Sequence, residues 1–224
     1  MISIIVPILN EASNIKTCIE KLKKLKGEKE IIFVDGGSKD NPEKIIGNNA
    51  KYFSETAGRA KQMNKGAFFS EGEVLLFLHC DTTLPPNAIQ EIQNATKDNK
   101  IIGGGFLHSF DKKNIFCGII SLSANIRTFT SHIFFGDQAI FIRKSIFDKM
   151  DGYRDLPLFE DWDFSSRMKK HGKTKIIKNK ISTSSRRIEY WGKIKTLYIW
   201  WGLSFLYLIG FSEEKLSKFY KNIR

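Results

Sequence analysis

The chain has 224 residues, of which 42% are hydrophobic and 27% are charged, and it contains only 5 prolines. This composition suits one domain with a sizeable core and excludes an intrinsically disordered chain. The three cysteines (Cys18, Cys80 and Cys117) lack the CxxC spacing of zinc sites, so we expect free thiols in a reducing cytoplasm. We also expect no secretory signal, because the apolar run Ile2–Leu9 is short and no basic residue precedes it.

The net charge of +12 is distributed unevenly along the chain. Residues 1–163 carry 21 Lys/Arg and 21 Asp/Glu, whereas residues 164–224 carry 15 Lys/Arg and 3 Asp/Glu. A neutral body followed by a basic C-terminal quarter indicates a catalytic domain and a segment that meets an anionic partner. The alternative is a general bias towards lysine. Such a bias would also make the first 163 residues basic, but their charges balance.

The first half of the chain alternates short apolar runs with amphipathic segments. In chain order we predict a strand at Ile2–Pro7, a helix ending at Lys26, a strand at Glu30–Val34, a short helix, a weak strand near Tyr52–Phe53, a helix at Gly58–Ser70 and a strand at Val74–Leu78. Strands that are apolar throughout and alternate with helices indicate an α/β fold, with a parallel sheet covered on both faces.

The pattern changes after about Asn99. Here we predict a glycine-rich strand at Ile101–Phe110, a helix at Ile115–Phe129, a β-rich stretch at Asp137–Arg143, a helix at Phe159–Lys170 and an apolar helix at Leu197–Gly210. The chain shows no internal repeat and no Pro/Gly linker. We therefore predict one catalytic domain over 1–185 and a basic, aromatic-rich helical extension over 186–224.

Polar residues follow three of the predicted strands, at Asn10-Glu11, Asp35 and Asp81. Ligands bind at the carboxyl ends of strands in open α/β sheets, so these residues would face one crevice. Each acid by itself could cap the next helix. All three together indicate a binding site.

Missing motifs narrow the choice of ligand. The chain has no GxGxxG, GxxxxGK[ST], GxSxG or HExxH segment. Rossmann-type dinucleotide binding, P-loop chemistry and the commonest hydrolase sites are therefore excluded. An acid-lined crevice without a glycine cradle would need a divalent metal to hold a phosphate.

Several segments carry a family resemblance: SIIVPILNEASNI, EIIFVDGGSKD, GRAKQMNKGA, GEVLLFLHCDTTLP and GDQAIFIRKSIFDKMDGYRDLPLFEDWDFSSRMKKHG. In this order they resemble the motifs of family 2 glycosyltransferases over residues 2–175, especially a small bacterial subgroup whose metal motif reads LHxDT. The resemblance implies a GT-A fold, with a Rossmann-like, mostly parallel sheet sandwiched by helices. It also implies transfer of a sugar from a UDP- or GDP-sugar to an acceptor hydroxyl.

The resemblance assigns roles to residues of the first half. The nucleotide-binding positions would be Pro7, Asn10, Glu11, Asp35, Gly37, Ser38, Arg59 and Asn64. Asp81 matches the last acid of the DxD motif, which holds Mn²⁺ or Mg²⁺ on the diphosphate, and His79 replaces the first Asp. Residues two apart in an extended strand end share a face. His79 could therefore bind the metal, bind the diphosphate or orient Asp81, and its imidazole would favour Mn²⁺.

The acidic start of the helix at Phe159–Lys170 resembles the position of the family's general base. We predict Asp161 as the base, with Glu160 as the reserve candidate, while Asp163 caps or pairs within the helix. The helix start favours an ionised carboxylate, and the adjacent acids raise its pKa. One base without a second, nucleophilic carboxylate indicates direct displacement with inversion.

The resemblance also places further residues near the sugar, the acceptor or the diphosphate. The sugar or acceptor positions would be Gly104, Asp137, Gln138 and Trp162. The glycines at 103–105 either let the backbone approach the sugar or form a bulged strand. Arg186 and Arg187 either clamp the diphosphate or belong to the basic surface.

The apolar segment Leu197–Gly210 is shorter than the roughly 20 residues that span a bilayer. With Lys193 and Lys195 before it, it predicts a helix lying on an anionic membrane, on the inner face of the cell membrane. Packing on the domain or in a homodimer stays an open alternative. Nucleic acid is not an expected partner, because the aromatic residues are not interleaved with the basic ones.

The acceptor is open at this point, with a lipid-linked molecule among the options. A second hypothesis is a catalytically degenerate scaffold, or a nucleotide-binding protein, of the same fold at a membrane surface. It follows from the replacement of the first DxD acid by His79. A nucleotidyltransferase is a weaker alternative, because the chain lacks a GxGTRxxP-type start.

Overall fold

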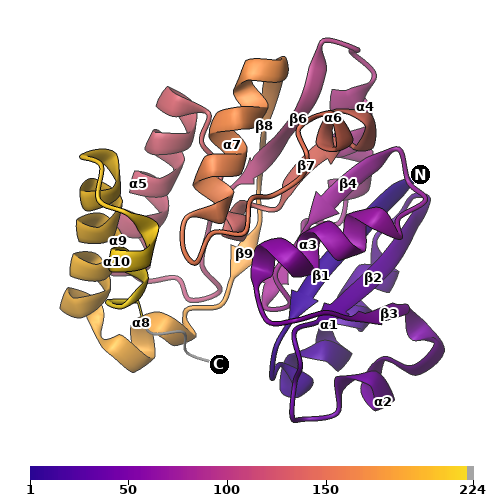
Figure 1. Cartoon of the computed structure of the whole chain (residues 1–224), viewed down its shortest axis with the longest axis horizontal. Helices are drawn as coiled ribbons and strands as arrows, with labels where there is room; N and C mark the ends of the chain where they lie inside the picture. Colours follow the sequence, from indigo (N-terminus) through magenta and orange to yellow (C-terminus); the bar gives the residue numbers. More distant parts are fainter. Residues whose placement is uncertain (221–224) are drawn as a thin grey trace.

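The computed structural model describes residues 1–220, and its centre is a seven-stranded sheet (Figure 1). The strands are β1 (Ile2–Ile8), β2 (Lys29–Asp35), β3 (Lys51–Ser54), β4 (Val74–Phe77), β6 (Ile101–Leu107), β7 (Ile140–Arg143) and β8 (Lys173–Lys180). Their order is β3-β2-β1-β4-β7-β6-β8. All neighbours pair in parallel except β7, which is antiparallel to β4 and β6. The predicted α/β class with a mostly parallel sheet is confirmed.

Helices cover both faces of this sheet, and the C-terminal helices lie to one side of it (Figure 1). They are α1 (Ala12–Lys24), α2 (Pro42–Ile46), α3 (Arg59–Phe68), α4 (Ala88–Thr96), α5 (Ile115–Ser131), α6 (Lys144–Lys149), α7 (Glu160–His171), α8 (Arg186–Trp191), α9 (Lys193–Leu208) and α10 (Glu213–Ser217). Two 3₁₀ turns lie at η1 (Gly47–Asn49) and η2 (Gly136–Gln138), and β5 (Thr82–Thr83) pairs antiparallel with β9 (Ser182–Thr183). Within residues 1–220, every helix is too short or too polar to cross a bilayer.

Strand β1 is buried on both faces, and alternate residues enter two different cores. Ile4 and Val6 pack in the core on the side of α1 and α4, whereas Ile5 packs in the core on the side of α3 and α7. This is the alternation that a pleated strand imposes. It explains why the run at Ile2–Pro7 is apolar throughout.

One buried side chain fixes the carboxyl ends of the two central parallel strands. The Gln62 Nε2 donates to the carbonyl oxygens of Ile8 and Val34, each at 2.7 Å. Gln62 is 1% exposed, so these bonds hold the strand ends at one level in a dry environment. The loops that leave β1 and β2 therefore start side by side.

The second half contains elements that the sequence did not predict. Strand β8 reads KTKIIKNK and lies at the sheet edge, so its lysines are tolerated on the exposed side. Helices α8 and α9 lie beside α5, away from the sheet, and α10 packs on α9 (Figure 1). Helix α9 covers most of the apolar helix predicted at Leu197–Gly210. The division at residue 185 stays a prediction. All three cysteines are free and buried.

Candidate functional site

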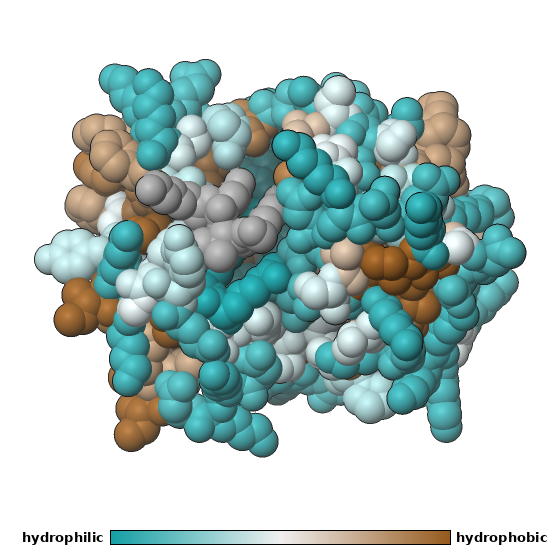
Figure 2. Space-filling model, turned by 90° about the horizontal axis from the view of Figure 1, so that it is seen from below, coloured by the Kyte–Doolittle hydropathy of each residue, from teal (hydrophilic) through white to brown (hydrophobic). Residues whose placement is uncertain are grey.

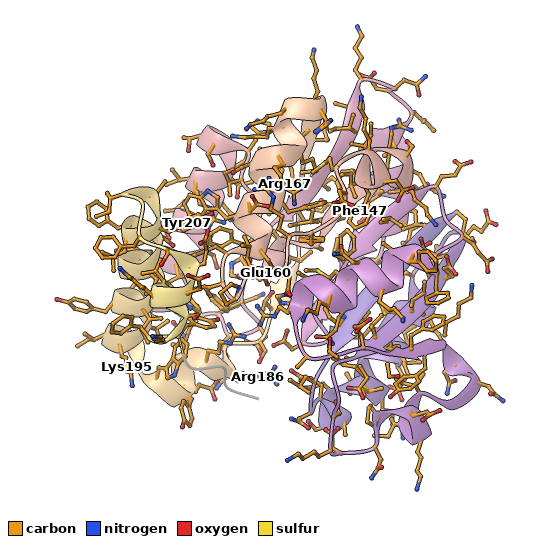
Figure 3. All side chains as sticks on the ribbon, in the orientation of Figure 1. Phe147, Glu160, Arg167, Arg186, Lys195 and Tyr207 are labelled. Atoms are coloured by element: carbon orange, nitrogen blue, oxygen red, sulfur yellow. The ribbon has the colours of Figure 1, made fainter. Side chains whose placement is uncertain are left out.

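A cavity of about 360 Å³ lies between α5, α9 and the start of α7, and it reaches the carboxyl end of β4. It brings together eight of the predicted site residues: Arg59, His79, Asp81, Asp137, Glu160, Asp161, Trp162 and Arg187. Figure 3 shows Glu160 between α7 and α3, near the centre of the molecule. Side chains from distant parts of the chain thus share one chamber, as an active site requires.

Asp161 lies in the first turn of α7 and is held by two backbone donors. The N–H of Gly136 donates to its Oδ2 at 2.7 Å, and the N–H of Trp162 donates to its Oδ1 at 2.8 Å. Burial raises the pKa of Asp161 to about 7, with a further contribution from Glu160, and the Gly136 bond opposes the shift. A carboxylate with a pKa near the operating pH is suited to proton transfer.

Gly136 is a site residue that the sequence did not single out. A Cβ at this position would lie 2.7 Å from Nε2 of His79 and 3.6 Å from Oδ2 of Asp161. His79 and Asp161 therefore both lie close to Gly136, and a side chain at this position would meet the His79 ring. Gly136 belongs to the GDQ segment, in which the family resemblance points only to Asp137 and Gln138.

Asp81 is linked to the loop after β1 through one arginine. Arg186 lies 3.2 Å from Oδ2 of Asp81, and it donates to both carboxylate oxygens of Glu11 at 3.1 Å and 2.7 Å. Burial raises the pKa of Asp81, while Arg186 lowers it and Glu11 raises it further. Two carboxylates and a partly exposed positive charge therefore meet at the carboxyl ends of β1 and β4. Figure 3 shows Arg186 between the C-terminal helices and the N-terminal half.

The donor set at this point suits a divalent ion that takes most of its ligands from a substrate. Within residues 1–220, no three His, Cys, Asp or Glu side chains form a complete metal cluster. Asp81 and His79 line the same cavity, with a carboxylate and an imidazole as donors. Mg²⁺ and Mn²⁺ are commonly held by one or two protein groups together with phosphate oxygens and waters. The residues present fit such an ion.

The turn after β2 forms a second polar cluster, outside the cavity lining. The buried Asp35 accepts hydrogen bonds from the backbone and hydroxyl of Ser38 and, at 3.1 Å, from the hydroxyl of Tyr52. Burial and Asp35 raise the pKa of Tyr52 to about 12, so it stays a donor. The backbone of Asn10 has φ 53° and donates to the Ser38 hydroxyl at 2.8 Å. Gly37, with φ 90°, completes an ordered turn.

Other predicted residues lie outside the cavity lining. Asn64 exchanges two hydrogen bonds with the backbone of Tyr153, at 2.8 Å and 2.9 Å. Gln138 is fully buried and bonds Arg127 and Thr128. A Cβ at Gly104 would lie 1.9 Å from the Lys175 carbonyl oxygen, so close strand packing requires this glycine. Pro7 belongs to β1. Their predicted substrate contacts stay predictions.

Two of the arginines that line the cavity come from α3 and α8. Arg59, at the start of α3, lies 3.6 Å from the Glu160 carboxylate. Arg187, at the start of α8, donates to the hydroxyl of Tyr220. Positive charge thus lies beside the carboxylates of the same cavity, which suits a diphosphate bridged by a cation.

A polar wall from α5 and β6 also went unpredicted. His108 is 1% exposed and is clamped by Asn125, whose side chain bonds the His108 backbone at 2.7 Å and 3.0 Å. The His108 Nε2 lies 3.7 Å from a carboxylate oxygen of Asp137. Among the described residues, neither this nitrogen nor Nε of Arg127 has a hydrogen-bond partner. Both side chains line the cavity and can donate to an incoming polar group.

Comparison with known proteins identifies the relatives of this chain. The model of glycosyl transferase family 2 matches residues 3–152. The chain is 28% identical, over 188 residues, to a "PGL/p-HBAD biosynthesis glycosyltransferase" of Mycobacterium bovis, covering 75% of this chain and 69% of the relative. A protein of the same description from Mycobacterium tuberculosis matches equally.

Two solved structures share the fold. The chain superposes on S. aureus TarS 1–349 in complex with UDP-GlcNAc with a TM-score of 0.63 and 16% identity, covering 83% of this chain. It spans only 58% of that TarS fragment. The mannosyltransferase PcManGT from Pyrobaculum calidifontis, in complex with GDP-Man and Mn²⁺, gives a TM-score of 0.64 at 16% identity, covering 97% of this chain and 68% of PcManGT. At such identities the likeness shows the GT-A fold.

Proposed function

The chain belongs to glycosyl transferase family 2, and from this premise we propose that it transfers a sugar from a nucleoside-diphosphate sugar to an acceptor hydroxyl. The observation that carries the proposal is the meeting of Asp161, with its pKa near 7, and the His79–Asp81 pair in one cavity. A base for the acceptor and ligands for the leaving group are the two chemical requirements of this reaction. The narrower assignment to an LHxDT subgroup stays a prediction.

Asp161 is the proposed general base. The acceptor O–H gives its proton to the Asp161 carboxylate as its oxygen forms a bond to the anomeric carbon of the sugar. The bond from that carbon to the diphosphate oxygen breaks, and its electron pair leaves with the nucleoside diphosphate. A single displacement of this kind inverts the anomeric centre. Glu160 stays the reserve candidate, because it lies beside Asp161 but pairs with Arg59.

Asp81 and His79 are the proposed protein ligands of Mn²⁺ or Mg²⁺. When bound, such an ion would neutralise the negative charge that develops on the leaving diphosphate. The presence of Mn²⁺ in the PcManGT complex and the imidazole of His79 both favour Mn²⁺. Arg186 and Arg187 would add positive charge on the same side.

The nucleoside would lie over the ordered turns after β1 and β2. The polar groups there, Glu11 and Asp35, can accept hydrogen bonds from ribose hydroxyls or a base N–H. The complexes of the two structural relatives contain UDP-GlcNAc and GDP-Man, so both UDP- and GDP-sugars are candidate donors.

Thermal-shift titration with UDP- and GDP-sugars, with and without Mn²⁺, tests this function. We expect a metal-dependent stabilisation by one nucleotide class, because ligands that bind only the folded state raise its stability. Asp81→Asn should abolish that stabilisation, and His79→Ala should weaken it. The scaffold hypothesis predicts no metal-dependent nucleotide effect, and that result would replace the present proposal.

A further inference from the structure

The cavity has two chemically different walls. Its floor is polar and contains Asp161 and the unpartnered nitrogens of His108 and Arg127. Its other wall is apolar and comes from two helices, with Ile120 and Ala124 on α5 and Ile199, Trp200 and Leu203 on α9. A small, fully polar acceptor would leave this second wall without a partner. The division suits an amphiphile with a polar head and an apolar chain.

The outer faces of the same two helices are exposed and apolar. On α5 the exposed residues are Ile115, Ile119, Leu122, Ile126 and Phe129. On α9 they are Ile194, Tyr198, Trp201, Phe205 and Leu208. Both sets advance by steps of four and three, so each forms one stripe. The exposed face of a helix in water is normally polar, and stripes of this size mark an interaction surface.

The two stripes lie on neighbouring helices. The Phe110 and Trp200 rings stack with centroids 6.2 Å apart, and Phe116, Ile120 and Leu197 belong to the same apolar cluster. The Lys193 Nζ lies 6.0 Å from the ring of Phe116, which brings together the N-terminal ends of α5 and α9. Figure 2 shows hydrophobic residues gathered at the end of the molecule that carries these helices.

The cavity opens at this apolar surface. Trp201 is 51% exposed and Leu208 is 66% exposed, and both also line the cavity. A molecule lying on the stripes could therefore enter the cavity past Trp201 and Leu208. This continuity connects the apolar surface with the chamber of Asp161.

The charges around the stripes favour an anionic bilayer over other apolar partners. Lys113 precedes α5, and Lys193 and Lys195 begin α9, all of them exposed. Lys112 also precedes α5 but pairs with Glu189 at 2.6 Å. Neither the α5 segment nor the α9 segment contains an acidic residue. A second copy of the chain would thus bring no counter-charge on these helices, whereas anionic lipid headgroups supply it.

We propose that the apolar stripes of α5 and α9 lie on an anionic membrane, and that an amphiphilic acceptor enters the cavity from it. Its apolar chain lies against the apolar wall, and its hydroxyl reaches Asp161. The oxygen-rich head group accepts hydrogen bonds from His108 and Arg127. This inference rests on the proposed function, and it extends the predicted role of the C-terminal helix by adding α5 and the route into the site.

The docking surface is tested by cosedimentation with phosphatidylcholine vesicles, with and without phosphatidylglycerol. We expect the full-length protein to bind vesicles that contain phosphatidylglycerol, with only partial loss at high salt, because apolar burial is insensitive to salt. Ile119→Asp and Phe205→Asp should each reduce binding about tenfold or more. Phe68→Asp, which changes a residue that is 78% exposed on α3, is the matched control and should bind as the wild type does.

The cavity wall is tested by thermal shift with dodecyl phosphate and butyl phosphate below their micellar concentrations. We expect greater stabilisation by the longer chain, and Ala124→Phe should remove that difference while keeping the nucleotide-induced shift. Equal stabilisation by dodecyl phosphate and butyl phosphate would overturn the proposal that the apolar wall binds an alkyl chain. A wild type that responds to nucleotide but ignores anionic vesicles would overturn membrane docking and leave the proposed function intact. A dimer that both Asp variants dissociate, without loss of vesicle binding, would likewise assign the stripes to self-association.

Discussion

At the residue scale, the candidate site depends on how a few side chains are held apart or together. Gly136 leaves space for the His79 ring and gives its N–H to Asp161. Phe159, with φ 63°, turns the chain so that α7 begins at the cavity and places Glu160 and Asp161 in its first turn. Non-glycine residues rarely adopt a positive φ. The position of the proposed base is therefore set by unusual local backbone geometry.

The raised pKa of Asp161 predicts a pH-dependent cost to stability. An unfolded Asp has a pKa near 3.8, whereas the folded pKa is about 7, so the folded state binds more protons between these values. The free energy of unfolding should therefore fall as the pH rises through this window. Asp161→Asn removes the ionisation and should raise the unfolding free energy above about pH 7, by an amount on the order of 1 kcal/mol or more.

Denaturant melts at about pH 5 and about pH 8 measure this effect. The stabilisation by Asp161→Asn should be larger at the higher pH. Asp163→Asn is the control, because Asp163 pairs with Arg154 and Arg167 and its removal should destabilise. An Asp161→Asn variant that is less stable than the wild type at the higher pH would show that the carboxylate is stabilised in its charged form.

Gly136→Ala should impair turnover more than stability. Its backbone is not in the left-handed region, so alanine fits the backbone, but the new Cβ would meet His79 at 2.7 Å. Displacing the groups around the reacting atoms should lower turnover at least about tenfold. Gly118→Ala, on α5, is the control, since a Cβ there has no neighbour within 4 Å. Turnover equal to that of the wild type would mean that the contact between His79 and residue 136 has no role.

At the scale of elements, the reliable predictions came from local patterns. The strands β1, β2 and β4 are short apolar runs with polar ends, and their positions were predicted within a few residues. Strand β8 was missed because its lysine-rich sequence is explained only by its place at the edge of the sheet. The antiparallel pairing of β7 also depends on distant partners, so no local pattern contains it.

Helix α8 positions Arg186 between two carboxylates that belong to other elements. Removal of the Arg186 side chain would leave the carboxylates of Glu11 and Asp81 without the cation that they share. Glu11 is only 8% exposed, so water cannot fully replace that cation. We expect Arg186→Ala to lower the unfolding free energy by about 1 kcal/mol, a value reduced for the partial exposure of Arg186. Mn²⁺ with the nucleotide should restore part of this loss, because the ion supplies positive charge at the same place.

Thermal melts with and without Mn²⁺ and nucleotide measure that rescue. Arg154→Ala, which breaks an exposed pair with Asp163, is the matched control and should show no metal-dependent recovery. If Arg186→Ala lowers the melting temperature equally with and without Mn²⁺ and nucleotide, Arg186 does not act at the metal site.

At the scale of the whole molecule, the candidate site combines the neutral body with the basic C-terminal quarter. The ordered motifs predicted the GT-A fold, and the predicted strands placed Glu11, Asp35 and Asp81 at or just after their carboxyl ends. The sequence did not predict that α5 and α9 enclose a cavity, or that His108 and Arg127 line it. The cavity forms because α5 packs against α9, a segment about 80 residues away in the chain. The pattern of exposed apolar residues on α5 becomes informative only once its buried side is known.

In the proposed reaction, Asp161 takes the proton from the hydroxyl that attacks the nucleotide-sugar. The most direct test is the rate of donor hydrolysis, with water as the acceptor, for the nucleotide-sugar selected by thermal shift. Asp161→Asn should lower this rate by about 10² or more while nucleotide affinity is unchanged, and the wild-type rate should rise with pH through about 7. Glu160→Gln should have the smaller effect. A larger loss in Glu160→Gln than in Asp161→Asn, or a wild-type rate in Asp161→Asn, would contradict the role of Asp161 as the base.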